Sequence, residues 1–265
     1  MPILTHGSDL ALAPTIKQVV QASGTVKAAL SRLSAAGFDA VQLDAALSGI
    51  RPRELDRRAR QDLLALLVRR GVRLGGIDLF IPQRHYLESE HQDRAMQSTL
   101  AAIEMAADLD RVPLSIALPI AQMDADLTSC VVEAADGHGV HVAVHAEDQL
   151  AALEKWLLDV DLPVIGAGVD PAALLAESQD PSQMTHRVSR RIVAGRLSDL
   201  SGSSGAGGLR CAVGEGELDV SSYRVAVDLA PNRVGPVVLD LRGVSAPLSA
   251  ATAADKAWKD AGVTL

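Results

Sequence analysis

The sequence repeats one pattern along its whole length: a short apolar run ends in a polar or charged residue, and a stretch with helical spacing follows. Strands that alternate with helices pair in parallel, and eight such units in one chain predict a single (β/α)8 TIM barrel over residues 1–265. The first run is Ile3 to His6 or Leu10 to Ala13. The clearer runs are 38–44, 72–78, 112–118, 140–145, 164–170, 192–199 and 237–240.

Composition agrees with a barrel and narrows the partners. Hydrophobic residues make up 48% of the chain and aromatic residues only 2%, so aliphatic side chains must fill the core. A net charge of −8 argues against a nucleic-acid partner. No apolar stretch approaches the roughly 20 residues of a membrane span, and the N-terminus lacks the pattern of a signal peptide. We therefore expect a small-molecule substrate; a homo-oligomer is compatible with the sequence.

The two cysteines give an indication of the cellular compartment in which the protein works. Cys130 and Cys211 are far apart and match neither a metal-ligand nor a redox spacing. We interpret them as reduced thiols of a cytoplasmic protein, with a disulfide as the alternative.

Strand alternation predicts which residues point into the barrel, and the chemistry of such barrels lies at the C-terminal ends of the strands. The mouth is expected to hold Gln42, Asp44, Asp78, His145, Asp170, Arg196 and Asp240. Carboxylates and an imidazole are ligands of divalent metals, which favours a shared site of His145, Asp170 and Asp240. The alternative is a solvated, charged rim whose acidic residues cap the helices that follow.

A glycine- and serine-rich stretch, 201–208, lies inside the predicted seventh βα loop. We interpret it as a flexible loop on the active face of the barrel. Phosphate binding is the alternative, although the spacing is not that of a P-loop and no Lys-Ser/Thr follows.

Five segments, in order, match the motifs of a known superfamily. Ala35 to Leu43 is similar to its "aGfdgVEl" strand, and Ala101 to Leu109 is similar to its "ai.lAadLG" helix. Val169 to Pro171 resembles "lDp", Arg196 to Asp199 falls where "HlkD" is expected, and Gly214 to Asp219 matches "GeGeld". Over nearly its whole length the chain thus resembles the xylose isomerase-like TIM barrels, the sugar phosphate isomerase/epimerase and type-2 AP endonuclease superfamily.

The resemblance implies a divalent-metal site, but the residues at its positions have changed. Family enzymes bind the metal through Glu on strand five, Asp or Glu on strand six, His or Gln on strand seven and Glu on strand eight. The matching positions are His145, Asp170, Arg196 and Asp240, and Gln42 stands at the family's strand-two Glu. Arg196 cannot bind a metal because its guanidinium group offers no lone pair. The inherited centre is therefore damaged or rebuilt.

If a site survives, we expect His145, Asp170 and Asp240 to bind Mn²⁺, Mg²⁺, Co²⁺ or Zn²⁺. Water, Glu147 or Glu215 would complete the coordination, and Arg196 would weaken the attraction for a cation.

The resemblance implies sugar isomerase or epimerase chemistry, in which metal-assisted proton transfer acts on a small polyhydroxy substrate. His145 and Asp240 are the candidate catalytic residues. His145 could serve as a base, because the pKa of a histidine lies near neutrality. Arg196 can hold a carboxylate or phosphate, so the substrate is expected to be a sugar, a sugar acid or a sugar phosphate. The remaining candidate substrate-binding residues are Gln42, Asp44, His85 and Glu215. The alternative is a non-catalytic descendant of the family that acts as a ligand-binding or assembly module.

Overall fold

This computed structural model describes residues 11–202 and 208–263. The alternative first strand at Ile3 to His6 and the centre of the glycine- and serine-rich stretch, 203–207, lie outside the described residues. The first strand is β1, Leu12–Pro14, so the second of the two predicted positions is close to correct.

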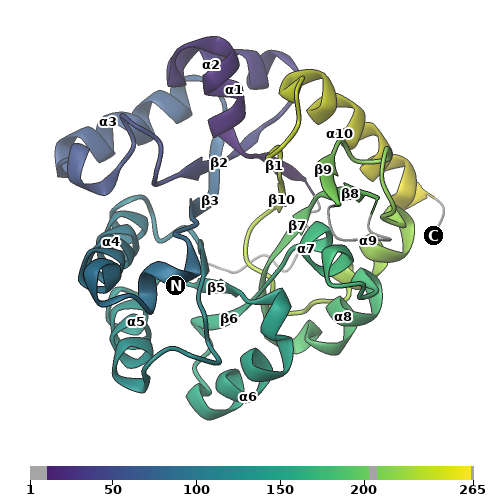
Figure 1. Ribbon diagram of the computed structural model, residues 1–265. Coiled ribbons are helices and arrows are strands. Elements are labelled where there is room, and N and C mark those ends of the chain that lie inside the picture. The colour runs from purple at the N-terminus through teal and green to yellow at the C-terminus, as the bar shows by residue number, and fades with distance from the viewer. Residues whose placement is uncertain (1–10, 203–207, 264–265) are drawn as a thin grey trace.

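Eight parallel strands form a nearly closed barrel in the order β1-β10-β7-β6-β5-β4-β3-β2. An isolated parallel bridge between Thr15 and Gln42 joins its two edges. Figure 1 shows the strands at the centre and the helices around them, which confirms the predicted (β/α)8 barrel. After β1, the barrel strands are β2 Ala40–Asp44, β3 Arg73–Leu79, β4 Leu114–Ala117, β5 Val142–His145, β6 Ile165–Val169, β7 Ile192–Leu197 and β10 Val237–Leu239.

The helices cover the outside of the barrel and bury its aliphatic core, which includes Leu30, Ile77 and Ile103. Among the described residues, no helix combines the length and the apolarity that a transmembrane span needs. The α-helices are α1 Ile16–Ser23, α2 Val26–Ala35, α3 Arg57–Arg69, α4 Ser89–Asp108, α5 Ala125–His138, α6 Leu150–Val160, α7 Pro171–Ala176, α8 Pro181–Arg187, α9 Val220–Asp228 and α10 Pro247–Val263. Short 3-10 turns are η1 Pro52–Glu54, η2 Gln83–Tyr86, η3 Glu147–Gln149 and η4 Ser189–Arg191.

Helix α3 begins later than the sequence indicates, because a proline, Pro52, and a helical spacing of leucines from Leu55 to Leu67 are typical of one helix over that range. Pro52 starts only the 3-10 turn η1, and Leu55 is extended, so the apolar spacing from Leu55 onward does not belong to one continuous helix. Helix α3 starts after Asp56, whose side chain accepts a hydrogen bond from the backbone N–H of Ala59. An aspartate that satisfies a free N–H at a helix start is a stronger boundary signal here than the proline.

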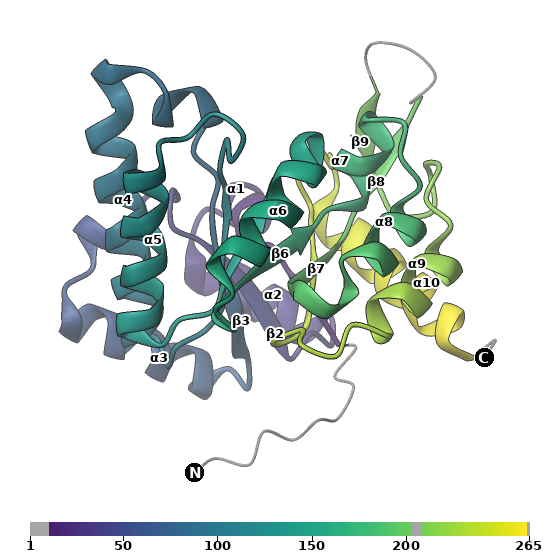
Figure 2. The ribbon, with the colours of Figure 1, turned by 90° about the horizontal axis from the view of Figure 1, so that it is seen from below.

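The predicted seventh strand also ends early, and the difference shapes the mouth of the barrel. Strand β7 stops at Leu197, and β8, Asp199–Ser201, instead pairs antiparallel with β9, Leu209–Cys211. Figure 2 shows this hairpin standing beside α7, at one end of the barrel. The hairpin brings Arg210 to the C-terminal ends of β6 and β10, where it contacts Asp170 and Asp240.

Strand β6 passes so close to its neighbours that two of its positions exclude a side chain. A Cβ atom on Gly166 would lie 2.3 Å from the carbonyl oxygen of Arg191 and 2.6 Å from Val193 Cγ2. A Cβ atom on Gly168 would lie 2.2 Å from His145 Nε2. The second glycine therefore provides the space that the buried imidazole of His145 occupies.

Gly166→Ala should lower the free energy of unfolding by about 1–3 kcal/mol, because overpacking against a carbonyl oxygen forces the backbone to move. The matched control is Gly137→Ala in α5, where an added Cβ meets nothing within 4 Å. Gly137 is the second-last residue of α5, so that control should stabilise the protein by at most about 0.5–1 kcal/mol, the preference of a helix for alanine over glycine. Urea denaturation followed by circular dichroism measures both changes, and equal effects of the two substitutions would contradict the crowding at β6.

Candidate functional site

The centre of the barrel mouth is a buried arginine. Arg196, on β7, is fully buried and donates from both terminal nitrogens to the two carboxylate oxygens of Asp78, at 2.8 and 2.9 Å. Gln42 Nε2 donates to the same carboxylate at 2.8 Å, and Arg196 Nε lies 3.4 Å from Asp240 Oδ2. A buried guanidinium group is stable only when it is paired in this way, so Asp78 fixes Arg196 across the barrel.

Two further arginines cover the neighbouring carboxylates. Arg210 donates to Asp170 Oδ2 at 2.5 Å and to Asp240 Oδ2 at 3.1 Å. Arg242 donates to Asp170 Oδ2 at 2.9 Å and contacts both oxygens of Asp240 through Nε. Ser198 donates to the remaining oxygen, Asp170 Oδ1, at 2.6 Å. We call Asp78, Asp170, Asp240, Arg196, Arg210 and Arg242 the arginine–aspartate cluster.

The arginines of the cluster keep Asp170 and Asp240 ionised despite their burial. Burial alone would raise the pKa of Asp170, but the charges of Arg210, Arg242 and Arg196 hold that pKa well below its usual range. Burial also opposes ionisation of Asp240, and attraction by Arg196 and Arg242 lowers its pKa to about 2. Burial alone would lower the pKa of Arg196, whereas Asp78 and Asp240 raise it. Three carboxylates and three guanidinium groups thus form a charge-balanced network.

An aromatic ring and a histidine complete this end of the barrel. The ring of Phe80 packs against two arginines: its centroid lies 5.1 Å from Arg196 Cζ and 4.6 Å from Arg242 Cζ. The same ring makes an edge contact with the imidazole of His145. His145 Nδ1 lies 2.8 Å from Glu147 Oε1, which also accepts the backbone N–H of Asp170 at 2.9 Å. His145 Nε2 is buried and has no hydrogen-bond partner among the described residues. With Nδ1–H donating to the carboxylate, Nε2 retains its lone pair.

The turn from Gly214 to Asp219 has a structural explanation. Asp199 is fully buried, and its carboxylate accepts hydrogen bonds from the backbone N–H groups of Gly214, Gly216 and Leu218, at 2.9–3.0 Å. A Cβ atom on Gly216 would lie 2.3 Å from Asp199 Oδ1, so a glycine is required there. The motif resemblance at this turn therefore reflects how one aspartate fastens the loop after the hairpin.

The predicted site residues separate into two groups. The structure brings Gln42, Asp170, Arg196 and Asp240 together, with His145 beside them. Asp44 instead pairs with Lys17 at 2.9 Å and accepts the backbone N–H of Ala46. Glu215 is exposed in its turn, and His85 lies in the connection between β3 and α4. Among the described residues, no hydrogen bond or ion pair joins these three side chains to the cluster, and a substrate-binding role for them stays a prediction.

Arg210 and Arg242 are the cluster members that sequence reasoning did not single out. Arg242 shares inward parity with Asp240, and that signal could have found it. Arg210 follows the glycine- and serine-rich stretch, where no strand pattern was recognised, so nothing in the sequence placed its side chain at the mouth.

The mouth does not fit a divalent cation in this arrangement. Both oxygens of Asp170 and both oxygens of Asp240 accept hydrogen bonds from arginine or serine. Three guanidinium groups at this position would repel a cation, and Arg196 fills the space beside Asp240. Metal binding by His145, Asp170 and Asp240 therefore stays a prediction that the arginines oppose.

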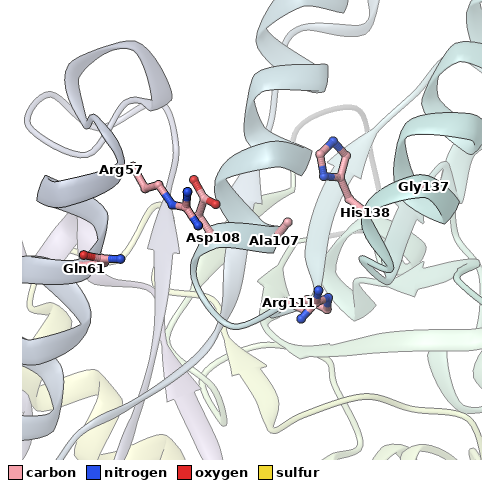
Figure 3. Close-up of a pocket in the computed structure, with 7 residues that line it drawn as sticks. All are labelled: Arg57, Gln61, Ala107, Asp108, Arg111, Gly137 and His138. Carbon is pink, nitrogen blue, oxygen red and sulfur yellow. The ribbon is translucent and has the colours of Figure 1, made fainter.

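A separate polar hollow lies on the outside of the barrel. Its volume is about 390 Å³, and Figure 3 shows side chains from α3, α4 and α5 around it. Helices α4 and α5 end at this hollow, so it lies at the end of the barrel where β4 and β5 begin. It is therefore remote from the arginine–aspartate cluster. Its lining residues are Arg57, Gln61, Ala107, Asp108, Arg111, Gly137 and His138.

Comparison with known proteins shows the fold. No protein-family model matches the sequence, and no curated protein is significantly similar to it. A xylose isomerase domain protein from Planctomyces limnophilus is 16% identical, with a TM-score of 0.73 over 95% of this chain and 96% of that protein. A xylose isomerase-like TIM barrel protein from Mycobacterium smegmatis, in complex with magnesium, is 15% identical, with a TM-score of 0.68 over 97% of this chain and 98% of that protein.

A sugar epimerase has the same architecture. The 3-keto-D-glucoside 4-epimerase from E. coli is 13% identical, with a TM-score of 0.70 over 95% of this chain and 99% of that protein. This chain therefore has the xylose isomerase-like TIM barrel fold, as its motifs predict.

Asp78→Asn should lower the free energy of unfolding by about 3–5 kcal/mol, because it removes the carboxylate that accepts two hydrogen bonds from the buried guanidinium group of Arg196 and leaves only Asp240, 3.4 Å from Nε, as the nearest counter-charge. The control is Asp255→Asn, which removes a carboxylate from a surface pair with Lys259. It should change stability by no more than about 0.5 kcal/mol. Urea denaturation at neutral pH measures both, and a small effect of Asp78→Asn would show that Arg196 does not depend on this pair.

Proposed function

We propose that this protein binds a small polyhydroxy anion, a sugar acid or a sugar phosphate, at the barrel mouth without a divalent metal. The observation that carries the proposal is the contact of Arg210 and Arg242 with both Asp170 and Asp240. The two aspartates occupy the positions that bind the metal in the family that the sequence resembles. Here the positive charge beside them belongs to guanidinium groups, whose paired N–H donors match carboxylates and phosphates.

The two outer arginines are accessible to a ligand. The side chains of Arg210 and Arg242 are 24% and 35% exposed, whereas Arg196 behind them is 0% exposed. No hydrogen bond joins Arg242 Nη1 to another residue of the described part of the chain. That nitrogen can donate to an incoming anion while Nε and Nη2 keep their contacts with the aspartates.

Unsatisfied groups at the same end support a hydroxyl-bearing ligand. Gln42 Oε1 and His145 Nε2 are both buried acceptors without a partner among the described residues. Buried polar atoms are rarely left without a hydrogen bond, so a ligand hydroxyl or a water molecule is expected beside Gln42 Oε1. His145 Nε2 faces Gly168 and can accept a hydrogen bond from a ligand only after the imidazole ring turns. The sugar class is further supported by the similar fold of a 3-keto-D-glucoside 4-epimerase.

Calorimetric titration with uronates, aldonates, sugar monophosphates and matched neutral sugars tests the proposal. At least one anion should bind equally well with and without EDTA, and its neutral counterpart should bind at least about tenfold more weakly. Arg242→Gln should lower the affinity for the anion by about tenfold or more, since it removes a charged hydrogen-bond donor.

The control for that substitution is Arg187→Gln, which removes an exposed arginine paired with Glu154 on the outer helices. It should leave binding unchanged. Binding that disappears with EDTA, or neutral sugars that bind as tightly as anions, would contradict a metal-free anion site.

Isomerase or epimerase chemistry is a second candidate, favoured by the pairing of His145 with Glu147. A carboxylate that holds Nδ1–H leaves Nε2 as a proton acceptor, which is the arrangement of a general base. Sugars that bind should then incorporate solvent deuterium without added metal, and His145→Gln should abolish the exchange. Ligands that bind without any exchange would leave the protein as a binding module.

A further inference from the structure

A second group of metal-ligating side chains lies in the connection between β3 and α4, outside the arginine–aspartate cluster. His85, Glu88 and His91 each offer one ligand atom, and these three atoms lie within 4.8 Å of one another. His85 belongs to the 3-10 turn η2, Glu88 immediately precedes α4, and His91 is in its first turn. The spacing is His-x2-Glu-x2-His.

The side chains already converge without a cation. The two imidazole rings have their centroids 4.7 Å apart, and His91 Nε2 lies 3.8 Å from Glu88 Oε2. Bond lengths of about 2.0–2.2 Å around tetrahedral zinc place neighbouring ligand atoms roughly 3.3–3.5 Å apart. Side-chain rotations that bring the three atoms closer by up to about 1.5 Å would give that spacing.

The backbone that carries these ligands is anchored to the core. Tyr86, between the two histidines, is fully buried and shares a hydrogen bond with Thr99 on α4 at 2.9 Å. Gln92 donates to the carbonyl oxygen of Tyr86 at 2.8 Å, and the backbone N–H of His91 donates to Glu88 at 2.8 Å. The ligands thus project from a segment whose course is fixed, which lowers the entropy that metal binding must overcome.

We propose that His85, Glu88 and His91 form a transition-metal site that prefers Zn²⁺. Two imidazoles and one carboxylate suit zinc and similar first-row metals, whereas Mg²⁺ and Ca²⁺ prefer sites made of oxygen ligands. Three protein ligands leave a fourth position for water or another donor. The cation would fasten the segment that begins five residues after Phe80, the ring under Arg196 and Arg242.

Arg94 competes with the metal for His91. Its guanidinium group donates to His91 Nδ1 at 3.0 Å, so the neutral imidazole carries its proton on Nε2, the atom that faces Glu88. Coordination through Nε2 requires that proton to move to Nδ1 and Arg94 to leave. A guanidinium charge this close to the site also repels a cation. Removing Arg94 should therefore strengthen metal binding.

The experiment is a Zn²⁺ titration of untagged, metal-stripped protein by calorimetry, with Co²⁺ absorption as a report on coordination geometry. One Zn²⁺ per chain should bind, and millimolar Mg²⁺ should not displace it. His91→Ala and Glu88→Gln should each lower the affinity for Zn²⁺ by at least about tenfold, and Arg94→Ala should raise that affinity severalfold. His138→Ala is the control, because it removes an exposed histidine elsewhere and should change nothing.

The alternative outcomes each overturn the proposal. Absence of Zn²⁺ binding at millimolar concentration, or unchanged binding in the His85→Ala/His91→Ala double variant, would show that these residues form no site. If Asp170→Asn abolished binding while the double variant retained it, the cation would sit at the barrel mouth. That last result would also contradict the metal-free function proposed above, whereas the first two would leave that function untouched.

Discussion

The polar end of this barrel depends on the buried pair of Arg196 and Asp78. A guanidinium group at 0% exposure needs partners for its charge, and Asp78 accepts hydrogen bonds from two of its nitrogens while Nε lies 3.4 Å from Asp240 Oδ2. The pair spans the barrel from β7 to β3, so it also limits where Gln42 and Asp240 can lie. Phe80, one residue beyond the end of β3, packs its ring against the same guanidinium group. Removing Arg196 would leave the buried carboxylate of Asp78 without a counter-charge, and removing Asp78 would leave Arg196 with Asp240, 3.4 Å from its Nε, as its nearest carboxylate.

Replacing a cation with arginines preserves charge balance but changes the chemistry available. The positive charges of the three guanidinium groups balance the negative charges of Asp78, Asp170 and Asp240. A divalent cation would balance two of those three charges. Guanidinium groups, however, donate hydrogen bonds and carry no vacant orbital, so they cannot act as a Lewis acid on a hydroxyl or carbonyl oxygen. They instead suit the recognition of planar carboxylates and of phosphates. With Arg196 on β7, this end of the barrel offers hydrogen-bond donors rather than a Lewis acid.

Strand parity predicted the contents of the mouth well where a side chain lies on a barrel strand. Gln42, Asp78, His145 and Arg196 all point inward as their alternation requires. Parity failed for Asp44, because it is the last residue of β2, where Lys17 and the turn after the strand take its carboxylate. It could not find Arg210, since that residue reaches the mouth on a hairpin formed by the loop after β7. Contacts made by loops depend on pairings between distant segments that local sequence patterns do not encode.

The two aspartates around β7 show why fold and function separate in this chain. Asp199 points away from the mouth and holds the Gly214 to Asp219 turn through backbone N–H groups, so its role depends only on the fold. Asp170, at the end of β6, points into the mouth, where its partners are side chains that substitution can exchange. The contacts that secure the backbone and the contacts that line the mouth are therefore made by different residues. A sequence can resemble known barrels at its turns and strands while the side chains at its mouth differ.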